Sequence, residues 1–361
     1  MKKLIAAAVA TAVIAPMTAI AAGPTLYGKI QMSVNYLDNK GDNPGKYKEW
    51  SLNSNHSRIG VKGSEDIGNG MKVGYLIEWN VDMDGDQADL GERNRAVTLS
   101  GDWGTALAGK WDTPLKTLGR KLDLFGERLG DTRNMNTGAV LDARTPNTIA
   151  YVTPNMSGFS ATLAYVFDAE QLSGTNSADD TDYNAYSING IYNNGPLLLG
   201  AAYENMADDL FGPNAENQAV WRLGGSYKFG DFKILGSYTG ISDAAGMDGK
   251  DTSIWSLGGA YAMGNNTIKL QWSMRDEYDD WKVGGVKVND IGKDTGANNW
   301  AIGLDHAMSK RTTVYVEYGQ VSNDDNSSSR TWSQLQNSAA AGRDSVTGDF
   351  EDNTGFGIGI I

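Results

Sequence analysis

One segment concentrates the side chains that can act on a charged solute. Residues 112–144 read DTPLKTLGRKLDLFGERLGDTRNMNTGAVLDAR, and charges of both signs follow one another along it. A polar connection of this length inside a compact domain is usually either functional or disordered. A solvated surface loop is the ordinary interpretation of such a run of charges, so only the elements around it can show whether the segment has a function. Its acids include Asp123, Glu127, Asp131 and Asp142, and its bases are Lys116, Arg120, Lys121, Arg128 and Arg133.

The other reactive side chains predict no enzyme. The chain has no cysteine and two histidines, His56 and His306, which lie far apart in sequence with no serine-based catalytic arrangement beside them. The acidic run 82–86 resembles a calcium loop, but its glycine comes one position early. Arg93 also stands where that loop needs a bidentate glutamate. We therefore predict no catalytic residues, no metal site and no cofactor.

The N-terminus indicates export. Two lysines precede the apolar run Leu4–Ile14, which is too short to span a bilayer, and Ala19-Ile20-Ala21 has the form of a cleavage site. We predict a signal peptide over residues 1–21 and a single domain over 22–361. No later stretch has the roughly 18 consecutive apolar residues of a transmembrane helix. A formal net charge of −13 argues against binding to nucleic acid.

The mature chain alternates apolar and polar residues with a period of two, which is typical of strands with one apolar face. Sixteen segments follow this pattern or end at turn residues. They are 25–39, 49–65, 71–82, 93–101, 104–112, 146–153, 157–168, 181–193, 195–206, 219–229, 231–241, 252–263, 266–276, 298–309, 311–322 and 352–361. Very short connections such as Gly230 alternate with long polar ones such as 277–297, which is the rhythm of an up-and-down barrel.

The width of such a barrel decides which face meets water. Sixteen strands enclose too wide a lumen for side chains to fill, so the apolar face must point outward to lipid. Closure also leaves no unpaired backbone edge in hydrocarbon. We therefore predict an all-β, transmembrane, antiparallel up-and-down β-barrel. A secreted soluble all-β binding protein is the alternative, and it would be a monomer that needs no detergent.

In a barrel of this kind, residues 113–143 have room to fold inward as a third loop that narrows the lumen. Opposed rows of fixed charge then create a strong transverse field, which admits polar solutes and excludes apolar ones. The predicted acidic row on the loop is Asp123, Glu127 and Asp131. The predicted basic wall is Lys29, Arg58, Lys62 and Arg95, which have lumen parity, together with Arg144 at the start of the sixth strand.

Several of these motifs resemble a known family. Leu26–Lys29 (LYGK), Ser57–Gly63 (SRIGVKG) and Arg93–Ala96 (RNRA) look like the first, second and fourth strands of the general diffusion porins of Gram-negative outer membranes. The spacing Asp123-x3-Glu127-x3-Asp131 is similar to the acidic row of their third loop, and Arg144 matches a basic wall residue. The likeness covers essentially the whole mature chain.

This resemblance implies a trimeric, sixteen-stranded pore in the outer membrane, surrounded by lipid and lipopolysaccharide and open to ions and small hydrophilic solutes. It also implies that the acidic loop Asp82–Glu92 latches onto a neighbouring subunit. The chain departs from the family in the five bases of its third loop and in ending at Ile361 rather than an aromatic residue. A non-specific channel is the favoured function. A substrate-selective channel is the alternative, but it would need an aromatic slide or an almost purely basic constriction.

Overall fold

The structure, a computed structural model, describes residues 23–40, 47–85, 90–136, 138–167, 184–212, 214–329 and 352–361. The predicted signal peptide, 1–21, and part of the acidic loop Asp82–Glu92 lie outside these residues. Among the residues described, no helix is long and apolar enough to cross a membrane.

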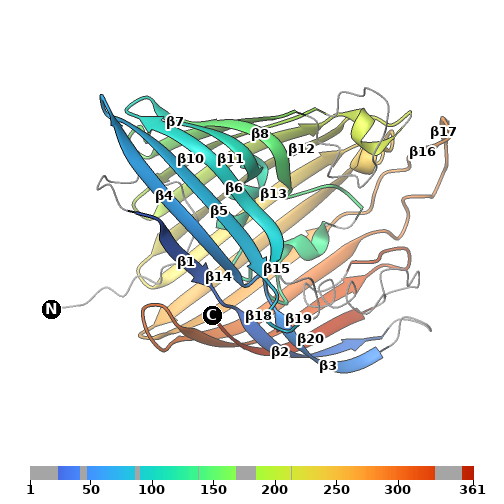
Figure 1. The fold of residues 1–361 in the computed structure, drawn as a ribbon. Helices are drawn as coiled ribbons and strands as arrows, with labels where there is room; N and C mark the ends of the chain where they lie inside the picture. The colour runs from blue at the N-terminus through green and yellow to red at the C-terminus, as the bar shows by residue number, and fades with distance from the viewer. Residues whose placement is uncertain are drawn as a thin grey trace.

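The chain forms one antiparallel sheet of 18 strands, which Figure 1 shows wrapped into a barrel. The first nine are β1 Thr25–Lys29, β2 Met32–Asn39, β3 Tyr47–Ser54, β4 Arg58–Gly68, β5 Met71–Val81, β6 Leu90–Gly101, β7 Gly104–Asp112, β8 Arg144–Val152 and β9 Phe159–Val166. They are followed by β10 Ala185–Asn194, β11 Leu197–Met206, β12 Gln218–Phe229, β13 Phe232–Ser242, β14 Thr252–Met263, β15 Asn266–Arg275, β18 Ala297–Ala307, β19 Thr313–Asn323 and β20 Asp352–Ile360. A separate hairpin, β16 Lys282–Val283 with β17 Val286–Lys287, lies in a connection.

Each strand from β4 onward pairs with the next member of the sheet, as an up-and-down topology requires. The barrel closes because β2 pairs with β20 on one side and with β3 on the other, while β1 pairs with β4. The sequence analysis predicted sixteen strands. The difference of two arises because the first two predicted strands are each broken, into β1 with β2 and β3 with β4.

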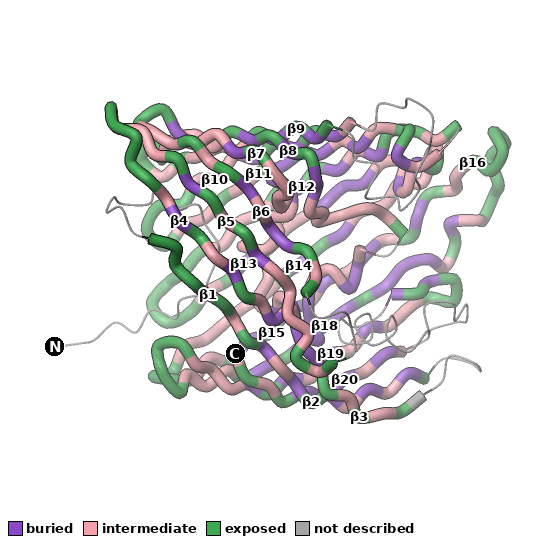
Figure 2. The backbone as a smooth tube through the Cα atoms, in the orientation of Figure 1, coloured by how far each residue is buried: buried purple, intermediate pink, exposed green. Residues whose placement is uncertain are grey.

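Burial alternates along the strands, as Figure 2 shows, and separates two faces. On β2, for example, Ser33 and Asn35 are buried inside while Val34 is 45% exposed outside. Apolar side chains dominate the exposed face and polar ones the enclosed face, which is the distribution of a barrel in lipid with a polar lumen. Tyr27 on β1 points inward instead, where its hydroxyl donates to the carboxylate of Glu78.

Outward aromatic side chains form an aromatic belt toward the end with the long connections. Cross-strand partners share a face of the sheet, and Tyr318, Phe356, Tyr36 and Trp50 are successive partners across β19, β20, β2 and β3. Ring contacts continue the belt through Trp300 with Tyr318 and through Trp255, Tyr238 and Trp221. The belt members are Tyr165, Tyr186, Tyr203, Trp221, Tyr238, Trp255, Trp300, Tyr318, Phe356, Tyr36 and Trp50.

Candidate functional site

The third loop, residues 113–143, runs through the interior of the barrel. It begins with helix α1, Pro114–Gly119, whose first turn is capped by the Thr113 hydroxyl, an acceptor of the Lys116 N–H, with proline at the first helical position. Two short 3₁₀ helices follow, η1 Arg120–Leu122 and η2 Thr132–Met135. Asn189 on β10 donates to the carbonyl of Pro114 at 2.8 Å, which holds the start of the loop against the wall.

Glu127 lies at the inner tip of this loop and faces the basic wall. Its carboxylate is 3.2 Å from Arg58 on β4, contacts the ammonium of Lys29 on β1, and is 3.2 Å from Arg120 of the loop itself. The residue has a φ of 64°, a left-handed conformation that costs free energy in a non-glycine residue. Burial alone would raise the pKa of the Glu127 carboxyl, but Lys29, Arg120 and Arg58 hold it well below its usual range.

The breaks in the first two predicted strands position Lys29 and Arg58. Where β1 gives way to β2, the Gln31 N–H donates to the Ser57 hydroxyl at 3.0 Å and its carbonyl accepts from the Asn55 N–H at 2.9 Å. Gln31 Nε2 also donates to the Glu127 carbonyl at 3.1 Å. The two strand breaks and the loop tip are therefore one hydrogen-bonded unit, and this unit sets Lys29 and Arg58 on either side of the Glu127 carboxylate.

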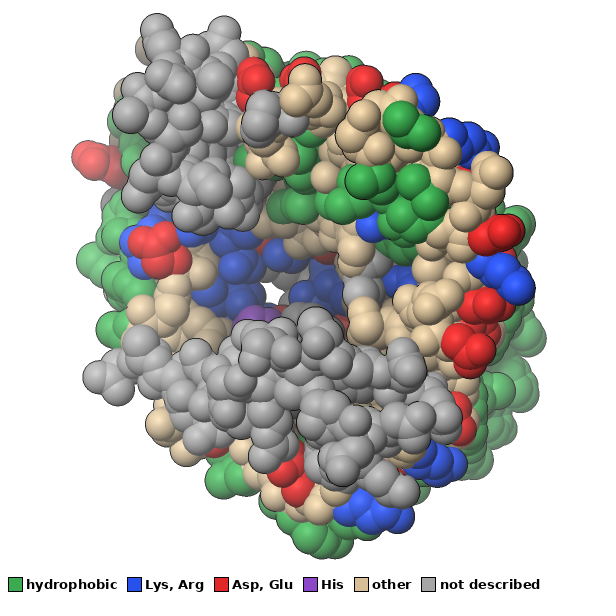
Figure 3. Space-filling view, turned by 90° about the vertical axis from the view of Figure 1, so that its right-hand side faces the viewer, with side chains coloured by type: hydrophobic (Ala, Val, Ile, Leu, Met, Phe, Trp, Pro, Cys, Tyr) green, Lys and Arg blue, Asp and Glu red, His purple; other side chains and the backbone are tan. Residues whose placement is uncertain are grey.

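Two more ion clusters continue along the wall. Glu78 on β5 is 2.5 Å from Arg93 on β6 and 3.9 Å from Arg58. At the root of the loop, Asp112 is 2.9 Å from Lys116 and 3.0 Å from Arg144. Figure 3 looks into the barrel and shows an opening with Lys and Arg side chains gathered around it.

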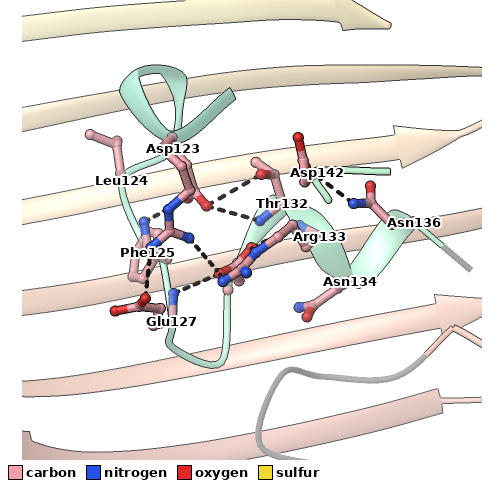
Figure 4. Close-up of polar contacts among 12 residues, drawn as sticks. Asp123, Leu124, Phe125, Glu127, Thr132, Arg133, Asn134, Asn136 and Asp142 are labelled. Atoms are coloured by element: carbon pink, nitrogen blue, oxygen red, sulfur yellow. Dashed lines mark hydrogen bonds and ion pairs between the residues drawn. The ribbon is translucent and has the colours of Figure 1, made fainter. Parts of the chain in front are cut away.

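Asp123 and Asp131 differ from Glu127, because both carboxylates hold the loop's own backbone (Figure 4). Asp123 accepts the N–H of Phe125 at 2.8 Å, the N–H of Thr132 at 3.3 Å and the Nε2 of Gln271 on β15 at 3.0 Å. Asp131 is fully buried and accepts the Glu127 N–H at 2.6 Å and the Arg133 side chain at 2.6 and 2.9 Å. These two acids shape the loop that presents Glu127.

A latch fastens the loop tip to the wall at β18 and β19. The Arg128 guanidinium donates to both carboxylate oxygens of Asp305 on β18, at 2.7 and 3.4 Å, and lies over the Tyr315 ring. Lys269 on β15 is 3.0 Å from Asp305 and donates to the Leu124 carbonyl at 3.0 Å. The loop is thus held to the wall at its start, by Asn189, and at its tip, by Asp305.

The predicted site residues are only partly brought together. Lys29 and Arg58 meet Glu127, and Arg144 joins Asp112. Lys62 points inward nearer the short turns, where its ammonium lies 5.3 Å from the centroid of the Tyr27 ring.

Arg95 does not have the predicted lumen orientation. The register between β5 and β6 shifts so that Ile77 pairs with Arg95 while Trp79 pairs with Glu92. Such a bulge sets two residues, here Arg93 and Asn94, against one partner and reverses the alternation beyond it. Arg95 therefore shares the outer face with Ile77, and it pairs there with Glu92 at 3.0 Å.

The sequence analysis did not identify Arg93, Glu78, Asp112 and Lys116 as site residues. Arg93 lies in the same RNRA motif as Arg95, so the motif indicated the strand but strict alternation selected the wrong arginine. Asp112 and Lys116 are four residues apart at a strand-to-helix junction, a spacing that favours an ion pair once the helix is recognised. Across the described ranges, no group of His, Asp and Glu is arranged to hold a metal ion.

Comparison with known proteins settles the family. The family model for Gram-negative porins matches residues 6–326. The chain belongs to the Gram-negative porins.

Among its relatives, outer membrane porin protein 32 of Delftia acidovorans is 31% identical over 338 residues, covering 90% of each chain. An outer membrane porin protein of Bordetella pertussis is 27% identical over 270 residues, covering 67% of this chain and 70% of that one. The solved structure of an anion-selective porin from Comamonas acidovorans matches with a TM-score of 0.73 at 27% identity, covering 94% of this chain and 98% of the other.

This membership establishes the broad function. The porin is a passive channel of the outer membrane of a Gram-negative bacterium and not an enzyme. The exposed apolar face of its strands and their polar inner face have the physical form that this role demands.

Proposed function

We propose that this porin is a general diffusion channel for ions and small hydrophilic solutes, narrowed by its third loop, and that it conducts anions better than cations. The observation that carries the proposal is the excess of cations around the loop tip and the facing wall. Leaving the latch aside, the cations of the Glu127, Glu78 and Asp112 clusters and of the loop's own pairs are Lys29, Arg58, Arg93, Lys116, Arg120, Arg133 and Arg144, against the carboxylates of Glu78, Asp112, Asp123, Glu127 and Asp131.

Seven cations against five carboxylates leave a positive excess of two in a confined space. At the loop tip the carboxylate is also the more enclosed partner, since the side chain of Glu127 is 5% exposed while those of Lys29 and Arg120 are 21% and 28% exposed. A passing ion therefore meets ammonium and guanidinium groups more than carboxylates. Fixed charge of one sign in such a passage concentrates ions of the other sign.

The mixture of signs favours a general channel over a substrate-selective one. Every described cation of the constriction is already paired with a carboxylate of the protein, so these cations do not form a dedicated binding site for one anion. Direct ion pairs along a water-filled passage instead present local dipoles, with which polar solutes interact favourably and apolar solutes do not. The anion-selective porin from Comamonas acidovorans, to which the chain is similar, supports the sign of the preference.

The test is the zero-current potential of the purified porin in a planar bilayer under a KCl gradient. The proposal predicts stepwise channel conductance with a potential of the sign for chloride. The preference should weaken as the salt concentration rises toward 1 M, where the Debye length falls to about 3 Å. A cation-preferring channel would refute the charge argument, and the absence of conductance would refute the channel itself.

We also propose a homotrimer in which the outer surface of β6 and β7 faces the neighbouring subunits. The aromatic belt covers β9 to β3 and is replaced on β6 and β7 by an outer ion cluster, Glu92, Arg95 and Lys110. At the level of the belt, near the interface, an exposed Lys or Arg costs only about 0–1 kcal/mol against lipid, so it is the missing aromatic side chains that mark this sector. The sector then faces neighbouring subunits, while the belt sector faces lipid and lipopolysaccharide.

A further inference from the structure

The apolar side chains of the third loop rest on glycines of the inner wall. Leu118 of α1 lies on Gly200 of β11, where a β-carbon added to the glycine would be 2.3 Å from Leu118 Cδ1. The next turn repeats the arrangement, since a β-carbon at Gly224 of β12 would be 2.4 Å from Leu122 Cδ1. Carbon atoms in contact prefer about 3.5–4.0 Å, so these wall positions accept no side chain while the loop stays in place.

The same relationship follows the loop around the barrel. An added β-carbon would be 3.1 Å from Leu124 at Gly258 of β14 and 2.9 Å from Phe125 at Gly303 of β18. At Gly355 of β20 it would be 2.8 Å from Leu129. We call these five inward positions, Gly200, Gly224, Gly258, Gly303 and Gly355, the glycine track.

Between these glycines, β15 holds the loop through polar groups instead. Gln271 accepts the Leu124 N–H at 2.7 Å and donates to the Gly130 carbonyl at 3.1 Å. Leu118, Leu122, Phe125 and Leu129 are 0–1% exposed, so the wall side of the loop is dry and closely packed.

We infer that the glycine track sets the width of the passage. Its residues are positioning residues that touch no solute: they let the loop lie directly on the backbone of the wall, and any side chain there moves the loop toward Arg58 and Lys29. The size limit of the channel is then encoded in uncharged positions of the wall. This inference rests on the proposed narrowing of the lumen by the third loop.

The test is single-channel conductance and the liposome-swelling rate with neutral sugars of increasing size. For Gly200→Ala, the three nearest atoms to the new methyl all belong to Leu118, at 2.3, 3.3 and 3.4 Å. Either the Leu118 side chain or the loop must shift by about 1 Å to restore contact distances, and Leu118 is fully buried. We therefore expect the loop to move, conductance to fall to about half and larger sugars to be slowed most. Gly259→Ala is the matched control, because a β-carbon there meets only the Lys233 carbonyl oxygen, at 3.8 Å.

Rescue distinguishes this inference from general damage to the barrel. Adding Leu118→Ala to Gly200→Ala removes the colliding side chain, and conductance should return to the wild-type value. If Gly200→Ala does not assemble, Gly303→Ala, whose two nearest atoms are Phe125 Cε1 and Cζ of the loop at 2.9 and 3.4 Å, takes its place. Conductance unchanged in both variants, or lowered equally in Gly259→Ala, would overturn the inference. A wild-type protein that forms no channel would instead overturn the proposed function.

Discussion

Glu127 and Arg58 are 69 positions apart in sequence, yet their carboxylate and guanidinium groups lie 3.2 Å apart inside the barrel. One belongs to a loop that folds inward and the other to a strand that begins at a break in the wall. Each is partly neutralised by the other, so removing either leaves an uncompensated charge in the passage. Substituting either residue of this pair is therefore the most direct way to change the proposed selectivity.

Replacing Glu127 by glutamine should increase the preference for anions. Lys29, Arg58 and Arg120 then lose the carboxylate that they share, and the positive excess around the passage grows by one charge. The zero-current potential under a tenfold KCl gradient should move further toward chloride, most clearly at low salt. Glu65→Gln, at an exposed position near a turn, is the control. An unchanged potential would show that Glu127 does not face the ion path.

The order of the third loop should depend on pH through Asp123. Burial, followed by the charge of Asp131, raises the pKa of the Asp123 carboxyl to about 6, above the value of about 3.9 for an unfolded chain. Because the folded-state pKa is the higher one, this contribution to stability is fully present below about pH 4 and is lost as the pH rises through 6. Open-channel current noise should therefore increase from pH 5 to pH 7.5, and Asp123→Asn should flatten that dependence. An equal pH dependence in the variant would assign it to another group.

Loss of the latch should loosen the loop without opening the barrel. Arg128→Ala leaves Asp305 with Lys269 alone and removes a side chain that is 7% exposed. Removing one partner of a buried pair costs roughly 2–5 kcal/mol. We expect frequent conductance flickers and cleavage of the loop by added protease. Arg311→Ala, on an exposed turn, should behave as the wild type. Quiet, wild-type channels from Arg128→Ala would argue against the latch.

A variant of Arg95 distinguishes an effect on the pore from an effect on the outer surface. Its partners Glu92 and Lys110 lie with it on the outside of the barrel, so Arg95→Ala should leave the zero-current potential unchanged. It should instead lower the temperature at which the detergent-extracted oligomer dissociates, as measured by electrophoresis without boiling. A shift in selectivity with no loss of oligomer stability would show that Arg95 faces the lumen.

The strands were largely predictable from the sequence because a period of two survives wherever one face is buried. The breaks at Ile30–Gln31 and Asn55–Ser57 were not, since the sequence keeps its polar and apolar pattern across them. The bulge at Arg93–Asn94 was equally hidden: it shifts the register between two strands, and no single strand carries its signal. Arg95 was therefore assigned to the wrong face.

The candidate site was predictable in composition more than in geometry. The spacing of Asp123, Glu127 and Asp131 indicated one acidic row. In the folded loop, however, Asp123 and Asp131 accept hydrogen bonds from backbone N–H groups of the loop, and only Glu127 of the three pairs with the basic wall. The glycines of the track were visible as single residues in strands. Their role depends on which loop atoms approach them, and no local pattern contains that information.

The most direct test of the account is the zero-current potential of Arg58→Gln under a KCl gradient at low salt, with Arg311→Gln as its control. Arg58 supplies positive charge to both the Glu127 and the Glu78 clusters, at 3.2 and 3.9 Å. Its loss should move the potential toward potassium and raise single-channel conductance, because the passage loses a cation and a bulky side chain together. A potential and conductance equal to those of the wild type would contradict the claim that the basic wall and the third loop form the selectivity-determining constriction.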